Sequence, residues 1–463
     1  MTLQTSGPIS LGNVAVELGR TSTTTTSLGE AAVRALAGIA SGPISLSNLY
    51  GKSNESYWHA SFGSTVISFT VLGTDSSGNI YASSTSAVFK WDKDGALIWA
   101  RTVSGPFIVG GCVDPAGNVY LAGGYYTSNY FAWVAKLNTA GTLQWQRSLN
   151  ASAQEYWYNA VVDAAGSVYV AGYSNSSGGS GNADALIAKY NSAGTLQWQR
   201  SIGGSANEYA THMALSPDGS LLVLSGYTTT STAGNTDALI TVINTATPSV
   251  SWQRSIGTSG FDYGYGVAID SSNAIYWLAG INNTLSLLKI SSGAVIQWQK
   301  SLPSSYGSGS VTFGPDGTLR VFAPVYAGAG IYQFATDETL LLARTISLDT
   351  SNGANSFSFT GLAVSSTAMV FSIYSSMDFY PYGFIDLCGA VVKVPADGSR
   401  TGTWSIPGAS SQGVTYSTAS PSIGTTFWSL TTRSFSLLSR SLTNATPTYS
   451  FVAASFTNTT TGI

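Results

Sequence analysis

One eight-residue segment occurs twice in this chain and constrains its fold more than any other feature. GTLQWQRS occupies residues 141–148 and again residues 194–201. Weaker copies recur along the chain, each with Trp, or in one case Leu, at the same place, at positions 58, 99, 145, 198, 252, 298, 342 and 404. An identical octapeptide far from its first copy indicates a structural repeat. A period of about 50 residues is typical of a propeller or a similar array.

The residues between two anchors predict four short strands. In the interval 160–202, apolar or alternating runs at 160–162, 168–172, 185–190 and 196–201 are separated by turn sequences such as Asp163–Gly166 and Asn191–Gly194. Asp or Asn followed by Gly is the chemistry of a tight hairpin turn. Four antiparallel strands per repeat form one blade of a β-propeller. We therefore predict an all-β fold, a β-propeller of four-stranded blades, preceded by a small N-terminal segment with short helices.

Counting the sets of predicted strands along the chain gives eight, which favours eight blades. The last set covers about Val414–Arg440, and Tyr57–Phe62 would then provide the outer strand of the last blade and close the ring. Seven blades is the alternative, with Thr448–Phe456 as the last unit's own fourth strand. The expected domains are residues 1–52 and the propeller, residues 53–463.

The repeats carry a family resemblance. AGSVYVAGYSNS and DALIAKYNSAGTLQWQRSIGGS lie in a stretch, from about residue 105 to 302, that resembles the bacterial SBBP-type β-propeller repeats. The resemblance implies the propeller fold and says little about activity, because propellers host many functions.

Composition excludes several functions. Charged residues are only 9% of the chain and the formal net charge is -3, so we expect no nucleic-acid partner. No apolar stretch is long enough for membrane insertion, and the start of the chain lacks the pattern of a secretory signal. Cys112 and Cys388 are expected to be free thiols. We find no metal-binding motif, cofactor motif or catalytic set, and so expect no metal, no cofactor and no enzyme activity.

Two groups of charged residues recur from blade to blade. Arg or Lys follows the anchor Trp by two positions in most copies, as in Arg147, and acid–Tyr pairs recur at 155–156, 208–209 and 262–263. We interpret both as structural, since the basic side chains can cover Trp faces. A binding site usually breaks the symmetry of a repeat.

The loops that vary between blades are the candidate recognition surface. In a propeller the b–c loops and the links between blades lie on the face opposite to the short turns. Here they are rich in aromatic residues amid Ser, Gly and Asn, a composition typical of adaptable recognition of sugars or proteins. Local packing is the alternative. The candidate binding residues are Tyr125, Tyr126, Tyr130, Tyr156, Trp157, Tyr158, Asp378, Phe379, Tyr380 and Tyr382.

The first fifty residues carry a different, smaller repeat. SGPISL occurs at 6–11 and 41–46, and Ser27–Glu30 has the pattern of a capping box before a helix expected from Leu28 to about Ala37. A further helical turn is expected at Val14–Leu18. A segment this short buries little alone, so we expect it to dock on a partner. Its expected docking residues are Ile9, Leu11, Ile44, Leu46, Leu49 and Tyr50.

This N-terminal pattern, SGPISL followed by a helix and then ISLSNLYGKS, resembles the N-terminal segments of tail and virion structural proteins of bacteriophages, notably marine and cyanobacterial ones. The resemblance implies a virion component of the tail, fibre or baseplate region, assembled in the host cytoplasm and present in several copies per particle. Residues 1–52 would then attach to other tail proteins. The propeller would be a scaffold or a head that binds a host-surface glycan or receptor.

Two alternatives stay open. The first is a glycan-degrading propeller enzyme, which needs converging carboxylates, for which Asp378 and Asp386 with Tyr380 are the candidates. The second is a bacterial carbohydrate-binding propeller.

Overall fold

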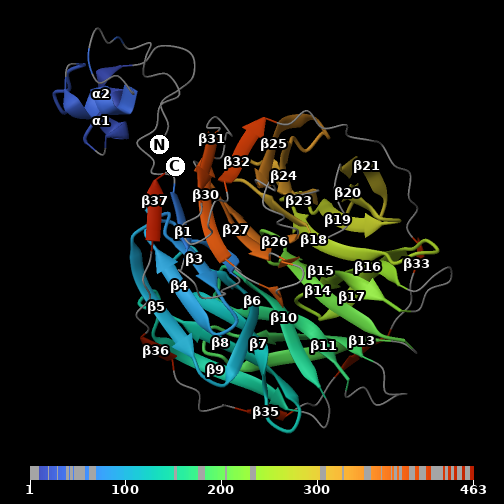
Figure 1. Cartoon of the computed structure of the whole chain (residues 1–463). Coiled ribbons are helices and arrows are strands. Elements are labelled where there is room, and N and C mark those ends of the chain that lie inside the picture. The colour runs from blue at the N-terminus through green and yellow to red at the C-terminus, as the bar shows by residue number, and fades with distance from the viewer. Residues whose placement is uncertain are drawn as a thin grey trace.

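The structure is a computed structural model of the whole chain. It describes residues 10–18, 20–28, 30–37, 41, 45, 58–61, 69–150, 154–175, 183–203, 206–229, 236–302, 309–325, 328–348, 356–365, 368–376, 378–379, 383–384, 388–395, 402–405, 413–418, 431–432, 436–439, 443–445, 451–453 and 459–462. Twisted antiparallel sheets stand side by side around a central axis, which confirms the predicted all-β propeller (Figure 1).

Six blades are each built from four strands that follow one another in the chain. The first blade has β2 (Thr70–Thr74), β3 (Ile80–Ser83), β4 (Ala87–Trp91) and β5 (Leu97–Val103), and the second has β6 (Pro106–Val113), β7 (Val119–Tyr126), β8 (Tyr130–Leu137) and β9 (Leu143–Asn150). The third has β10 (Glu155–Val162), β11 (Val168–Ser174), β12 (Asp184–Tyr190) and β13 (Leu196–Gly203), and the fourth has β14 (Glu208–Leu215), β15 (Leu221–Thr228), β16 (Asp237–Asn244) and β17 (Ser249–Ile256). The fifth has β18 (Tyr263–Ile269), β19 (Ile275–Ile281), β20 (Thr284–Ile290) and β21 (Ile296–Leu302), and the sixth has β22 (Ser310–Phe313), β23 (Leu319–Val325), β24 (Gly328–Phe334) and β25 (Leu340–Leu348). We refer to these as the first to sixth blades.

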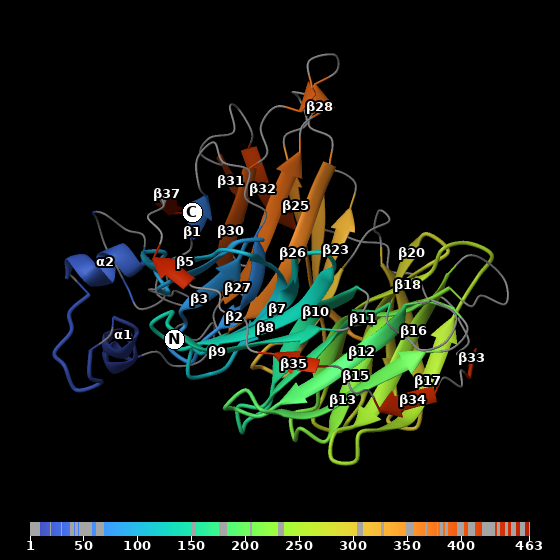
Figure 2. The same ribbon diagram turned by 90° about the horizontal axis from the view of Figure 1, so that it is seen from below.

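A composite sheet closes the ring. It joins β26 (Ser356–Val364), β27 (Ala368–Ser376) and β30 (Cys388–Pro395) to β1 (Trp58–Ser61), which pairs antiparallel with β30. The predicted closure by an N-terminal outer strand is therefore confirmed. We call this sheet the closing sheet. Between β27 and β30 the short hairpin of β28 (Asp378–Phe379) and β29 (Gly383–Phe384) projects beyond the end of the ring (Figure 2).

The expected eight blades are wrong. The described residues of the stretch 414–440, taken as an eighth strand set, pair with the sixth, fourth and third blades. The anchor Trp404 lies in β31 (Gly402–Ser405), at the edge of the sixth blade. The stretch 448–456 does not complete the last unit either, since β36 (Phe451–Ala453) pairs with β5 of the first blade. Six blades of consecutive strands and the closing sheet account for the ring.

The C-terminal strands form an outer belt. β32 (Gly413–Thr418) pairs with β25, and the later strands add to the outer strands of other sheets in reverse order around the rim: β33 (Thr431–Thr432) on β17, β34 (Ser436–Ser439) on β13, β35 (Thr443–Ala445) on β9, β36 on β5 and β37 (Thr459–Gly462) on β1. Figure 1 shows β33, β35 and β36 in red at the rim. Among the described strands, β21 of the fifth blade is the outer strand without a belt strand.

The hydrophobic core lies between neighbouring sheets. One cluster joins Tyr81 and Trp99 of the first blade to Leu121 and Trp133 of the second. The closing sheet contributes Val370 and Val391 to the cluster that also contains Phe89 and Trp91 of the first blade. Each blade therefore depends on its neighbours for burial, as in other repeat proteins.

Two short helices precede the ring. α1 (Leu11–Glu17) begins at the capping residue Ser10, and α2 (Ala31–Ala37) begins three residues later than predicted. The Glu30 carboxylate accepts a hydrogen bond from the Ser27 backbone N–H at 2.6 Å, which is one half of the expected capping box. The helices share a small apolar cluster of their own and lie outside the ring in both views (Figures 1 and 2). No helix in the described part of the chain is long and apolar enough to span a membrane.

Candidate functional site

The two faces of the ring differ in their connections. One face, the turn face, carries the short a–b and c–d turns, in which Gly78, Gly117, Gly166 and Gly194 take positive φ values of 76° to 90°. That backbone conformation favours glycine, which explains the Asp–Gly and Asn–Gly turn pattern. The opposite face, the loop face, carries the variable b–c loops and the links between blades. This assignment agrees with the prediction from blade topology.

A curved row of tyrosines lies on the loop face and crosses four blades. We define this tyrosine arc as Tyr126, Tyr130, Tyr156, Tyr158, Tyr173, Tyr209, Tyr227, Tyr263 and Tyr265. Its members stand at the loop-face ends of β7, β8, β10, β11, β14, β15 and β18. The arc therefore belongs to no single blade.

Ring contacts make the tyrosine arc continuous. Within blades, Tyr126 contacts Tyr130 with centroids 4.9 Å apart, Tyr156 stacks on Tyr173 at 5.4 Å, and Tyr209 stacks on Tyr227 at 4.8 Å. Between blades, the centroid distances are 4.9 Å for Tyr130–Tyr156, 5.1 Å for Tyr173–Tyr209 and 5.0 Å for Tyr227–Tyr263. Cross-strand aromatic pairs of this kind stabilise a sheet, and here they also join one blade to the next.

The tyrosine arc remains accessible from the loop face. Tyr126 at one end is 62% exposed, and Phe261 beside Tyr263 at the other end is 50% exposed. The intervening tyrosines are half-buried. A half-buried tyrosine offers a ring edge and a hydroxyl to a ligand while its position is fixed by packing.

Burial raises the pKa of three tyrosine hydroxyls in the middle of the arc. It is the main cause that raises the pKa of Tyr227 to about 12, with neighbouring tyrosines adding to the shift. Burial likewise raises the pKa of Tyr173 and Tyr209 above the ordinary value. These hydroxyls are therefore neutral donors and acceptors at physiological pH.

The carboxylates next to the arc point into the protein. Glu155, Glu208 and Asp262 are fully buried. Glu155 accepts a hydrogen bond from Ser174 Oγ at 3.2 Å, and Glu208 accepts one from Thr228 Oγ1 at 2.8 Å. Asp262 accepts hydrogen bonds from the backbone N–H groups of Thr258 and Asn282. The interpretation of the acid–Tyr pairs as structural is correct for these carboxylates, whereas the adjoining tyrosines form the arc.

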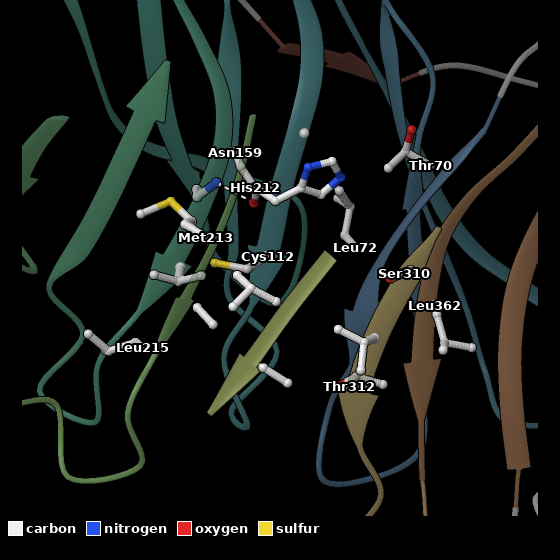
Figure 3. Close-up of a pocket in the computed structure, with 18 of the residues that line it drawn as sticks. Thr70, Leu72, Cys112, Asn159, His212, Met213, Leu215, Ser310, Thr312 and Leu362 are labelled. Carbon is white, nitrogen blue, oxygen red and sulfur yellow. Dashed lines mark hydrogen bonds between the residues drawn. The ribbon is translucent and has the colours of Figure 1, made fainter. Parts of the chain in front are cut away.

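The central channel of the ring is a second candidate site, after the tyrosine arc. A cavity of about 740 Å³ is lined by the innermost strands of the six blades and by Leu362 of β26. Tyr158 lines this cavity and also contacts Tyr173, so the tyrosine arc adjoins the channel. Figure 3 shows His212 and Met213 pointing in opposite directions from β14, with Cys112 and Asn159 on neighbouring inner strands.

The titratable groups of the channel are held neutral. Burial lowers the pKa of His212 to about 4, and the imidazole Nδ1 lies 3.0 Å from Thr211 Oγ1. Cys112 is a free thiol whose pKa is raised by burial and by the nearby Asp114 carboxylate. A thiol in that state is a poor nucleophile. Within the described ranges, no group of three His, Cys, Asp or Glu side chains could hold a metal ion.

Most predicted binding residues that the structure describes lie on the loop face. Tyr126, Tyr130, Tyr156 and Tyr158 belong to the tyrosine arc, whereas Tyr125 packs on Phe131 with centroids 5.2 Å apart. The prediction for Trp157 is wrong, because its side chain is fully buried in the core between the second and third blades. Alternation along β10 points Trp157 inward and its two tyrosine neighbours outward.

Several predicted residues lie outside the described part of the structure. Asp378 and Phe379 are described only as the strand β28, and Tyr380 and Tyr382 are not described, nor is Asp386. The same holds for the expected docking residues Ile9, Ile44, Leu46, Leu49 and Tyr50. Leu11 is described, and its side chain is 38% exposed on α1.

Sequence reasoning missed five members of the arc: Tyr173, Tyr209, Tyr227, Tyr263 and Tyr265. Each occupies a repeated position, and we expected a binding site to break the repeat. The signal was nevertheless present, since a tyrosine ends the strand in AGYS and SGYT and follows the acid in EY and DY.

The recurring basic residues act as the structural interpretation predicts. The guanidinium groups of Arg101 and Arg147 lie over the rings of Trp99 and Trp145, 5.4 Å and 5.9 Å from their centroids. Lys90 lies over the ring of Tyr81 and 3.7 Å from the Asp75 carboxylate. These cations cover aromatic faces within the blades.

Comparisons with known proteins give no family. No family model and no curated protein matches the chain. Among solved structures, the chain is similar to virginiamycin B lyase from Staphylococcus aureus, with 12% identity over 74% of this chain and 97% of that chain and a TM-score of 0.47. It is also similar to a gluconolactonase from Xanthomonas campestris, with 11% identity over 58% and 84% of the two chains and a TM-score of 0.35.

A third similar structure is a luciferin-regenerating enzyme, with 14% identity over 57% of this chain and 87% of that chain and a TM-score of 0.36. At such low identities and TM-scores, these likenesses carry no argument about activity.

Proposed function

We propose that this chain is a recognition protein of a bacteriophage particle, in which residues 1–52 attach to other tail proteins and the propeller binds a glycan or receptor on the host surface. The observation that carries the recognition half is the tyrosine arc, a continuous and partly exposed aromatic surface on the face with the variable loops. Tyrosine amid small polar residues is the composition that adaptable binding surfaces use.

The docking half rests on the N-terminal resemblance and on the character of α1 and α2. Their shared core includes Val14 and Val33, which are fully buried, while Leu11 and Val16 remain exposed on α1. A unit with so small a core and an exposed apolar side gains stability from a partner.

Truncation tests the docking half. A chain that lacks residues 1–52 should fold and remain soluble but should no longer join particles in an infected host. Incorporation is measured by immunoblotting of purified particles against the full-length chain as control. Normal incorporation of the truncated chain would remove docking from the proposal.

Binding tests the recognition half. The purified full-length chain, fluorescently labelled, should bind host cells, and Tyr126→Ala should weaken that binding. Val295→Ala is a matched control, because Val295 is an exposed apolar residue in a turn of the opposite face. Equal binding by both variants and the parent chain would contradict recognition through the arc.

A glycan-degrading enzyme is the second candidate, and the expectation of no enzyme activity stays a prediction. A glycosidase needs two carboxyl groups facing the substrate. Glu155, Glu208 and Asp262 do not meet this condition because they are buried and hydrogen-bonded. Asp378 and Asp386 are the remaining pair. Hydrolysis of host polysaccharide that is lost in both Asp378→Asn and Asp386→Asn would support this alternative over a pure binding role.

A further inference from the structure

We infer that the tyrosine arc binds an uncharged polysaccharide, laid along the curve so that several sugar units are held at once. This inference rests on the proposed recognition function and specifies the chemistry of its ligand. Three observations support it: the absence from the loop-face connections of charged side chains that could face a ligand, the neutral hydroxyls of Tyr173, Tyr209 and Tyr227, and the repetition of the arc from blade to blade.

The sequence of the loop-face connections in the second to fifth blades provides no cation that could hold an acidic glycan. Its connections, residues 104–106, 126–130, 150–155, 174–184, 203–208, 228–237, 256–263 and 281–284, contain neither Lys nor Arg. Carboxylates and sulfates are normally held by such residues through charge-assisted hydrogen bonds. An acidic polysaccharide would lose its hydration here without gaining a partner.

The same connections present no exposed anion to hold a cationic ligand. Their acidic residues are Glu155, Asp184, Glu208, Asp237 and Asp262, and none of these is more than 4% exposed. Among the described residues of this face, the surface open to a ligand therefore consists of tyrosine rings, tyrosine hydroxyls and small polar residues, with Phe261 at one end. This chemistry matches a neutral, hydroxyl-rich molecule with apolar C–H faces.

Repetition of the arc indicates a repetitive ligand. The stacked pair Tyr156–Tyr173 in the third blade recurs as Tyr209–Tyr227 in the fourth, and Tyr173–Tyr209 joins the two pairs at 5.1 Å. Equivalent sites in series suit a polymer whose units repeat, because each further unit that binds does so at a high effective concentration. A small ligand would contact one tyrosine pair and leave the other pair unoccupied.

A glycan microarray with the full-length chain tests the inference. The array holds neutral glycans together with uronic acid-containing, sialylated and sulfated ones. We expect binding to neutral glycans only. For the best neutral hit, calorimetry should give a Kd that changes less than about twofold between 50 mM and 500 mM NaCl, because no ion pair forms. A tetramer of its repeating unit should bind at least about tenfold more tightly than the dimer.

Variants tie the binding to the arc. Tyr209→Ala and Tyr227→Ala should each weaken binding about tenfold or more, as is common for tyrosines at the centre of a binding surface. Tyr126→Ala, at the exposed end, keeps the test valid should the central variants fail to fold, and it should weaken the tetramer more than the dimer. Val295→Ala, on the turn face, should bind like the parent chain.

The outcomes separate the inference from the proposed function. Binding of neutral glycans that weakens in the arc variants supports both the inference and the proposed recognition function. Binding of acidic glycans that weakens with salt would overturn the inference and leave recognition in place. Binding that all arc variants retain would overturn the arc as the site. Binding of no glycan on the array would overturn the inference and, with host cells also unbound, the recognition function.

Discussion

At the residue scale, the anchor tryptophans connect one blade to the next. The indole Nε1 of Trp99 donates to the Thr139 carbonyl in the following blade at 3.0 Å, and Trp145 does the same to Ser192 at 3.0 Å. Trp252 donates to Ser292 at 2.8 Å. The acceptor is in each case the c–d turn of the next blade. The tryptophan thus fills the space between sheets and also fixes their spacing.

Replacing one such indole tests this contact. Trp145→Phe removes the bond to Ser192 and should lower the free energy of unfolding by about 1 kcal/mol more than Trp298→Phe. Trp298 is a matched control, because its Nε1 is buried and has no hydrogen-bond partner. Urea unfolding followed by circular dichroism measures both. Equal losses would mean that packing alone accounts for the tryptophan.

His212 makes stability depend on pH. Its pKa is about 4 in the folded chain, because burial disfavours the charged ring, against 6.5 as the ordinary value. Between these values the unfolded chain binds the proton and the folded chain does not, so stability falls as the pH is lowered from about 6.5 toward 4. His212→Gln should remove this part of the decline in Tm.

The pH window separates His212 from Asp316. Asp316 has a pKa below its ordinary value of 3.8 because hydrogen bonds from Thr318 and Arg320 outweigh its burial. Its contribution is lost only below about pH 4, so it does not affect the range above. An unchanged slope of Tm between pH 6.5 and 4.5 in His212→Gln would contradict the assignment.

The sequence was most informative where a residue has a local role. The turn glycines, such as Gly166 and Gly194, were identifiable because positive φ is a property of the residue itself. Trp157 was misplaced because it was grouped with its half-buried neighbours Tyr156 and Tyr158, although the two-residue period of a strand would have turned it inward. The tyrosine arc was only partly foreseen, because ring contacts between blades join residues that are far apart in the chain.

At the scale of elements, the belt covers the outer edges of blades. Unpaired strand edges invite pairing with other chains, and proteins usually cover them. Here β33, β34, β35 and β36 cover the edges of β17, β13, β9 and β5. The sequence showed that strands form in this region, but their partners could not be predicted. A short strand can pair with any unpaired strand edge. Which edges are unpaired is decided only when the whole ring has formed.

Removing the belt should affect each covered edge separately. Truncation after residue 401 should increase amide hydrogen exchange in β5, β9, β13 and β17, because their outer backbone groups lose their partners. β21, which has no belt strand in the described part of the chain, provides the internal control and should change little. Size-exclusion chromatography should also show association of truncated chains. Uniform protection in all five strands would contradict a role for the belt.

At the scale of the whole molecule, the junction that closes the ring uses the same kind of hydrogen bond as the junctions between consecutive blades. Lys90 Nζ donates to the Thr139 carbonyl in the turn of the next blade, and Lys289 Nζ donates to the Thr336 carbonyl. Lys393 of the closing sheet donates in the same way to the Lys93 carbonyl of the first blade at 2.8 Å. The junction between the two ends of the ring is therefore built like any other junction, and it depends on β1 to complete its sheet.

Two truncations that differ by nine residues test this closure. Removal of residues 1–52 leaves β1 in place and should leave Tm nearly unchanged. Removal of residues 1–61 also takes β1, which uncovers β30 and deprives β37 of its partner. The second truncation should lower Tm by at least about 5 °C, as a loss of a few kcal/mol would in a chain of this size. Because β1 is the only piece of the described ring that differs between the two chains, similar melting of both would show that closure does not depend on it.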